Sequence, residues 1–167
     1  MGGRTFPRTV VGGISVSRMI IGSNWLAGYS HRSPAADQMI KHRHQSPETI
    51  VPMLVTFLNA GVDTMMAPFA GLPQILRAVR EAEEKTGRKM ILVDTPIINV
   101  DDNPTARQEA ESMIRKSKEL GASFCLIHHS SAEQLVNKNT RTIQRLDDYT
   151  KMIRDAGLVP GLSAHMA

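Results

Sequence analysis

The feature that most restricts the fold of this 167-residue chain is a unit that occurs four times along it. Each unit consists of an amphipathic helix, a glycine that ends the helix, and a short apolar run that favours a strand. In the first unit, Ile50, Leu54 and Leu58 recur at the spacing of one helix face. The four helices are expected at residues 46–61, 72–87, 103–121 and 139–157.

Short apolar runs follow each helix and also precede the first one. We expect strands at residues 19–22, 62–66, 90–94, 123–127 and 158–162. Continuously apolar strands that alternate with helices indicate a parallel sheet buried on both faces. Right-handed connections then allow either a closed barrel or an open, doubly wound sheet.

The connecting segments favour the barrel. Long polar segments follow the first, third and fourth strands, at residues 23–45, 95–103 and 128–139, which is where functional loops of a barrel lie. No Gly-x-Gly-x-x-Gly pattern follows a strand, which weakens the dinucleotide-binding alternative. We therefore predict an α/β fold of parallel (β/α) units, a half or truncated TIM barrel. Residues 1–167 are expected to form one such domain, with an N-terminal β-hairpin at residues 5–18 and then about five strands and four helices.

The number of expected strands has a consequence for assembly. A TIM barrel closes with eight strands over roughly 250 residues. A sheet of five strands would leave two edges and an apolar inner face uncovered. Since a second copy is the simplest cover for that face, we predict a homo-oligomer.

Composition excludes several classes of partner. The formal net charge is +4, but the basic residues lie among acids on the expected helices, and aromatic residues make up only 4% of the chain. This pattern argues against a nucleic-acid partner. No apolar run approaches the ~20 residues of a membrane helix, so we expect no membrane partner. A lone cysteine, Cys125, and the lack of a signal-peptide pattern predict a cytoplasmic protein.

Three segments of the chain resemble aldo/keto reductases. Residues 9–23, Thr-Val-Val-Gly-Gly-Ile-Ser-Val-Ser-Arg-Met-Ile-Ile-Gly-Ser, are similar to the hairpin and first strand that open that family. Residues 59–64, Asn-Ala-Gly-Val-Asp-Thr, are similar to its second helix–strand junction, and residues 126–129, Leu-Ile-His-His, to its fourth strand. The resemblance implies a TIM barrel with the hairpin at its floor, and it implies a catalytic histidine at His128.

The resemblance does not extend to the rest of the family's catalytic machinery. Aldo/keto reductases use an Asp–Tyr–Lys–His tetrad, in which the tyrosine donates a proton while NADPH supplies hydride. Only the histidine has a clear counterpart here, His128. Phe69 lacks the hydroxyl that the tyrosine would supply, and the third strand ends in Asp94 and Thr95 where the lysine belongs. Because phenylalanine cannot act as a general acid, we predict that the chain is not a classical NADPH reductase.

Polar side chains are expected to meet at the carboxyl ends of the strands. Histidine and carboxylate groups gathered there could bind a divalent metal or form an acid–base pair. We predict three catalytic residues, which are also the candidate metal ligands: Asp94, His128 and His165. Substrate-binding side chains are predicted at Asn24, Trp25, Tyr29, His31 and His129.

Plainer interpretations stay open for several of these residues. Asp94 could cap the turn that follows it, and the aromatic residues of the first loop could pack that loop onto the rim. His128 and His129 cannot both face the barrel axis if the strand continues through them. Cys125, with apolar neighbours, is expected to be a buried and inert thiol.

These observations lead to two functional hypotheses. The first is a TIM-barrel-type enzyme that acts on a small molecule by acid–base or metal-assisted chemistry at the rim. It would be a lyase, hydrolase or isomerase, or a divergent oxidoreductase, and its cofactor is open. The alternative is a non-catalytic half-barrel that serves in binding or assembly.

Overall fold

The computed structural model of the chain describes residues 6–44 and 46–164. Five strands form a parallel sheet whose order follows the chain. They are β3 (Ile21–Gly22), β4 (Thr64–Ala67), β5 (Ile91–Asp94), β6 (Phe124–Ile127) and β9 (Val159–Leu162). The predicted α/β fold with a parallel sheet is confirmed. The described residues form no closed barrel.

The chain divides into two compact units. Unit 1 comprises Met1–Ala67 and Gly71–Ile91, and unit 2 comprises Pro68–Ala70 and Leu92–Ala167. The helices of unit 1 are α1 (Asn24–Ala27), α2 (Pro34–Arg43), η1 (Pro47–Thr49), α3 (Val51–Asn59) and α4 (Pro73–Thr86). The later elements, in unit 2, are α5 (Pro104–Glu119), α6 (His129–Ala132), η3 (Glu133–Leu135), β7 (Val136–Asn137), β8 (Thr142–Ile143) and α7 (Leu146–Asp155). A short 3₁₀ turn, η2 (Phe69–Gly71), follows β4.

Unit 1 begins with the predicted hairpin. Strands β1 (Arg8–Val11) and β2 (Ile14–Ser17) pair antiparallel, and Val11 lies opposite Ile14. Gly12 and Gly13 both have positive φ, 55° and 81°, which is the backbone that a two-residue hairpin turn requires. The hairpin is therefore confirmed, apart from residue 5 of its predicted range, which lies outside the described residues.

The hairpin is fixed to the start of β4 by polar contacts. The Arg8 guanidinium lies 2.8 Å from the Asp63 carboxylate, and the Ser17 amide donates to the Thr64 hydroxyl at 3.2 Å. Asp63 belongs to one of the segments that resemble aldo/keto reductases. In this chain its carboxylate therefore holds the hairpin.

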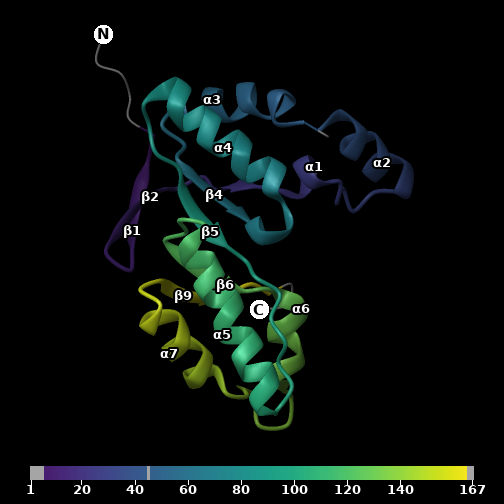
Figure 1. Cartoon of the computed structure of the whole chain (residues 1–167), viewed down its shortest axis with the longest axis vertical. Helices are drawn as coiled ribbons and strands as arrows, with labels where there is room; N and C mark the ends of the chain where they lie inside the picture. The colour runs from purple at the N-terminus through teal and green to yellow at the C-terminus, as the bar shows by residue number, and fades with distance from the viewer. Residues whose placement is uncertain (1–5, 45, 165–167) are drawn as a thin grey trace. The chain divides into compact units, whose positions relative to one another are not determined.

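The core of unit 1 lies where α3 packs against α4, which run side by side in Figure 1. Leu54 and Leu58 of α3 and Ile75 and Val79 of α4 are buried. These residues belong to the apolar stripes that the sequence indicated, because helical spacing brings them onto one face of each helix.

The long segment at residues 23–45 differs from the prediction of a polar loop, since it folds into α1 and α2. The start of α2 carries an ordinary signal: Ser33 accepts a hydrogen bond from the Ala36 amide, and Pro34 occupies the first turn. Periodicity could not find this helix because Ile40 is its only buried residue.

Unit 2 contains the helices that follow β5, β6 and the small hairpin. Asn103 caps α5 by accepting a hydrogen bond from the Ala106 amide at 2.8 Å, as its place before Pro104 suggested. The last helix begins at Leu146 rather than near residue 139, because β7 and β8 pair antiparallel ahead of it. Figure 1 shows α5 and α7 beside each other, and the two helices are in contact.

In the part of the chain that the structure describes, no helix has the length and apolar character needed to cross a membrane.

Candidate functional site

Two of the predicted catalytic residues, Asp94 and His128, lie at the carboxyl ends of neighbouring strands of unit 2. The chain segments that leave those strands are tied to one another. The His128 amide donates to the Pro96 carbonyl at 3.1 Å, and the Ser163 amide donates to the Ile127 carbonyl at 2.9 Å. The ends of β5, β6 and β9 therefore form one continuous edge, as parallel pairing requires.

Asp94 is the last residue of β5, and its side chain is 1% exposed. One carboxylate oxygen accepts from the Phe69 amide at 2.9 Å, and the other accepts from the Ser117 hydroxyl of α5 at 2.5 Å. Burial raises the pKa of Asp94, while the hydrogen bonds from Ser117, Phe69 and Thr95 act in the opposite direction. The carboxylate thus ties β5 to α5, and its catalytic role stays a prediction.

The Ser117 hydroxyl also meets the Cys125 thiol, whose sulfur lies 3.9 Å away. Cys125 is fully buried on β6, and burial raises the pKa of its thiol to about 12. A thiol with this pKa stays protonated at neutral pH, which fits the expected inert cysteine.

His128 follows β6 directly and caps the four-residue helix α6. Its Nδ1 accepts a hydrogen bond from the Ser130 amide at 3.3 Å, and the Ser130 hydroxyl lies 2.8 Å from the same nitrogen. When Nδ1 is an acceptor, the neutral imidazole carries its proton on Nε2. The local hydrogen bonds therefore favour the tautomer of the neutral His128 ring that carries its proton on Nε2.

His129 lies against His128, with ring centroids 4.0 Å apart and planes tilted by 41°. The alternation of a strand does not separate the two rings, because β6 ends at Ile127 and His129 begins α6. Both side chains are half-buried. The structure therefore brings these two predicted site residues of unit 2 into contact.

The third predicted catalytic residue, His165, lies outside the described residues. Within residues 6–44 and 46–164, no group of three or more His, Cys, Asp or Glu side chains is placed to hold a metal ion. The candidate metal set of Asp94, His128 and His165 therefore stays a prediction.

The predicted substrate-binding residues other than His129 lie in unit 1, along α1 and the turn after it. The Asn24 amide nitrogen lies 3.1 Å from Nε2 of His31, whose backbone has a positive φ of 56°. Trp25 and Tyr29 are half-exposed, and each has a cation over its ring: Arg32 at 5.8 Å and Lys41 at 5.8 Å, respectively. Both rings are therefore solvent-exposed and contact cations, and they do not pack the loop into a core.

The turn that carries these residues is held by Asp37 of α2. One of its carboxylate oxygens accepts from the Ser30 amide at 2.7 Å and from the Ser30 hydroxyl at 2.6 Å. The hydroxyl and amide of Ser30 lower the pKa of Asp37, because both donate to its ionised form.

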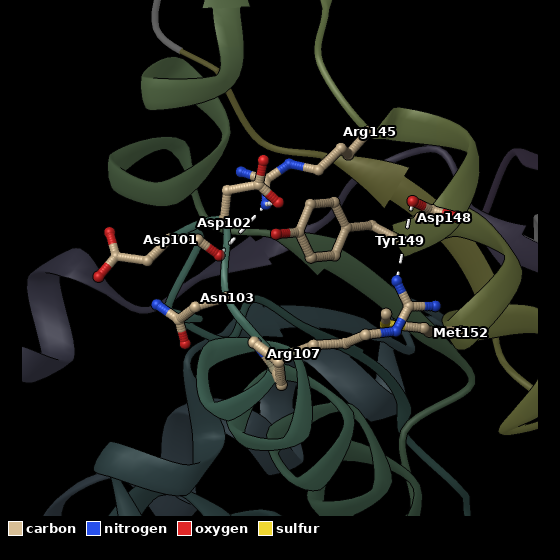
Figure 2. Close-up of a pocket in the computed structure, with 9 residues that line it drawn as sticks. Asp101, Asp102, Asn103, Arg107, Arg145, Asp148, Tyr149 and Met152 are labelled. Carbon is tan, nitrogen blue, oxygen red and sulfur yellow. Dashed lines mark hydrogen bonds and ion pairs between the residues drawn. The ribbon is translucent and has the colours of Figure 1, made fainter.

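Unit 2 also contains a cavity that none of the predicted residues lines. It has a volume of about 340 Å³ and lies between the N-terminal ends of α5 and α7 (Figure 2). Its walls are Asp101, Asp102, Asn103, Pro104, Arg107, Arg145, Asp148, Tyr149 and Met152. The sequence indicated a functional loop at residues 95–103, which includes one wall of the cavity, but no pattern in it predicted that residues 145–152 lie beside this loop.

Arg145 forms the upper wall of the cavity in Figure 2. Its guanidinium donates to the carbonyls of Val100, at 2.5 Å, and Asp101, at 3.2 Å, and to the Asp102 carboxylate at 3.1 Å. The same guanidinium lies 5.9 Å above the Tyr149 ring. Arg145 itself has a left-handed backbone with a φ of 53°, and its side chain reaches the segment that precedes α5.

No protein-family model matches this chain, and no curated protein matches it either. The resemblance to aldo/keto reductases therefore rests on the three short segments described above.

Proposed function

We propose that this chain is a TIM-barrel-type enzyme that acts on a small polar molecule, similar to aldo/keto reductases in fold and different from them in chemistry. In this proposal the parallel strands belong to a half barrel, and His128 transfers a proton at the end of β6. The chemistry would be that of a lyase, isomerase or hydrolase, or of a divergent oxidoreductase. The one cysteine, buried and reduced, supports a cytoplasmic location.

The observation that carries the proposal is the state of the His128 ring. It lies half-buried at the carboxyl end of a parallel strand, where active sites of this architecture are built. Ser130 fixes both the orientation and the tautomer of the ring through Nδ1. A general acid needs such orientation, because proton transfer depends on a defined donor atom; the acid is the imidazolium form of the ring, whose Nδ1–H can donate to the Ser130 hydroxyl.

The test compares the purified wild-type chain with His128→Gln on a panel of small aldehydes, ketones and hydroxy acids, with and without NADPH. Product formation is followed by NMR. We expect the substitution to lower kcat/KM by roughly 10²–10⁴-fold for any compound that is converted, the usual contribution of a general acid or base. His42→Gln is the matched control, since it removes an exposed imidazole from α2. Equal turnover by His128→Gln and the wild type would refute the role of His128.

The second candidate is a non-catalytic binding protein. The burial of Asp94 favours it, because a carboxylate that is 1% exposed and bonded through both oxygens cannot reach a substrate. This candidate predicts that no compound of the panel is turned over and that elemental analysis finds no stoichiometric metal. A metal bound at one equivalent, and lost in His128→Gln, would instead support metal-assisted chemistry.

We also propose that copies of the chain associate. β3 is an edge strand in the order of the sheet, and Met19 and Ile20, which lead into it, are each nearly half-exposed. An apolar strand edge is a surface that proteins usually cover. Light scattering at micromolar concentration should give at least twice the 18.4 kDa of one chain, and a monomer mass would contradict this proposal.

A further inference from the structure

The cavity between α5 and α7 contains a polar group that has no hydrogen-bond partner among the described residues. The Tyr149 side chain is only 4% exposed, yet its hydroxyl makes no hydrogen bond to any other described residue. Among the described residues, every side-chain oxygen or nitrogen that is fully buried has a hydrogen-bond partner, so an atom without a partner must be accessible to solvent. The hydroxyl therefore opens into the cavity, and in Figure 2 it points toward the segment that carries Asp101 and Asp102.

The opposite wall supplies a second donor. The nearest carboxylates to the Arg107 guanidinium are Asp148 at 3.8 Å and Glu111 at 3.9 Å, both beyond hydrogen-bond distance. Arg107 is about half-exposed and makes no hydrogen bond to a described residue through its side chain. In contrast to Arg145, which donates hydrogen bonds to three acceptors, Arg107 makes only two long ion pairs, so its N–H groups can still donate hydrogen bonds to a ligand.

The charges around the hydroxyl favour an anion. Asp101, Asp102 and Asp148 line the cavity, but Asp102 is already paired with Arg145. Burial is the largest cause that raises the pKa of Tyr149. Among the charges, Arg145 and Arg107 act more strongly to lower it than Asp102 and Asp148 act to raise it. The α5 end of the cavity adds a helix dipole, since no acidic residue lies in its first turn.

The volume and the remaining walls limit the size of the anion. A cavity of about 340 Å³ lies near the lower end of the roughly 300–1,000 Å³ that small-molecule sites occupy. Pro104 and Met152 offer apolar surface to a short carbon chain. The three aspartates oppose a second negative charge, which disfavours phosphate and other multivalent anions.

We propose that this cavity binds a small organic monocarboxylate, whose carboxylate accepts hydrogen bonds from the Tyr149 hydroxyl and the Arg107 guanidinium. The hydrogen bonds are charge-assisted, and the planar fork of Arg107 matches a carboxylate. The site lies between helices, and it does not depend on His128.

The test is an NMR titration of the full chain with sodium pyruvate and sodium acetate as probes. The chain has two tyrosines, so the Tyr29→Phe variant assigns the ring signals of Tyr149. Millimolar pyruvate should shift those signals saturably. Propane-1,2-diol, an uncharged molecule of similar size, and inorganic phosphate should bind more weakly.

Variants then identify the donors. Tyr149→Phe, followed through the backbone amides of α7, should weaken pyruvate binding roughly 10-fold or more, because it removes one hydrogen bond to a charged group. Arg107→Ala should weaken it at least as much. Arg115→Ala, which removes an exposed arginine from the same helix, should leave the affinity unchanged. The proposal is overturned if neither carboxylate shifts Tyr149, if the diol or phosphate binds as tightly, or if Arg107→Ala and Arg115→Ala have the same effect.

Discussion

Asp37 in unit 1 and Asp94 in unit 2 each accept a hydrogen bond from a serine hydroxyl, and they also accept from one backbone amide at Asp37 and from two, those of Phe69 and Thr95, at Asp94. The distances are similar: 2.7 and 2.6 Å at Asp37, and 2.9 and 2.5 Å at Asp94. Yet the pKa of Asp37 is lowered and that of Asp94 is raised. Asp37 is partly solvated, and its hydrogen bonds dominate. Asp94 is 1% exposed, and the loss of water outweighs its hydrogen bonds even though it has one more backbone donor than Asp37.

The comparison shows that position after a strand does not define the task of a polar residue. The segment after β3 exposes Trp25 and Tyr29 and uses Asp37 to hold a turn. The end of β5 turns its carboxylate inward, toward Ser117 of α5. The difference in solvation, rather than the set of hydrogen-bond donors, explains why the pKa shifts of Asp37 and Asp94 have opposite directions.

The largest expected loss of stability comes from truncation of Asp94, the buried one of the two aspartates. Asp94→Ala leaves the Phe69 amide buried without an acceptor, which costs roughly 1–3 kcal/mol, and it removes the shorter of the two hydrogen bonds of the Ser117 hydroxyl, which then reaches only the Met113 carbonyl at 3.3 Å. We expect the free energy of unfolding in urea to fall by roughly 2–5 kcal/mol. Asp37→Ala, which removes the same two hydrogen bonds at a solvated site, should cost much less. Equal losses would mean that burial does not distinguish the two aspartates.

The two aspartates should also give opposite pH dependences. For Asp94 the folded pKa lies above its usual value of 3.8, so the folded state binds the extra proton. Its contribution to stability is present below that value and is lost as the pH rises through the raised pKa, with a slope of at most about 1.4 kcal/mol per pH unit. For Asp37 the folded pKa lies below 3.8, and its contribution is lost as the pH falls through it.

The measurement is urea unfolding from the lowest pH at which the chain stays folded up to neutral pH, on the wild type, Asp94→Asn and Asp37→Asn. Asp94→Asn should remove the fall in stability with rising pH. Asp37→Asn should remove a fall on acidification and leave the Asp94 effect in place. A wild-type profile that Asp94→Asn leaves unchanged would contradict the raised pKa.

The N-terminal caps of α5 in unit 2 and α2 in unit 1 allow a second comparison of the two units. Asn103 caps the 16-residue α5 of unit 2 at 2.8 Å, whereas Ser33 caps α2 of unit 1 at 3.2 Å, where one helix residue is buried. We expect Asn103→Ala to cost about 1 kcal/mol and Ser33→Ala about half of that or less. Thermal unfolding of the two variants measures the difference, and a larger loss for Ser33→Ala would reverse the ranking of the two helices.

The smallest effect is expected at the exposed aromatic residues of unit 1. Trp25→Ala and Tyr29→Ala should change the free energy of unfolding by less than about 0.5 kcal/mol, because both rings are more than half exposed. Urea titration checks this. A loss above 1 kcal/mol for either variant would show that the ring packs against apolar neighbours, which the described contacts do not include.

The repeat of helix, glycine and strand was enough to predict the parallel sheet, because each apolar stripe and each stop lies in one stretch of sequence. α2 escaped since a helix that buries only Ile40 has no stripe to detect. The inward orientation of the Asp94 side chain could not be predicted, because Ser117, which fixes it, lies 23 residues later on another element. The cavity at Tyr149 escaped for a similar reason: its walls come from two segments about forty residues apart.

Because Cys125 is buried, the rate at which its thiol is alkylated can measure local opening of unit 2. Burial raises the pKa of the thiol to about 12, so it stays protonated at pH 7, and the sulfur is out of reach of a dissolved reagent. Alkylation therefore requires β6 to part from α5. Since no other cysteine competes, the labelling rate of the intact chain at increasing reagent concentration reports how often and how long that part of unit 2 is open.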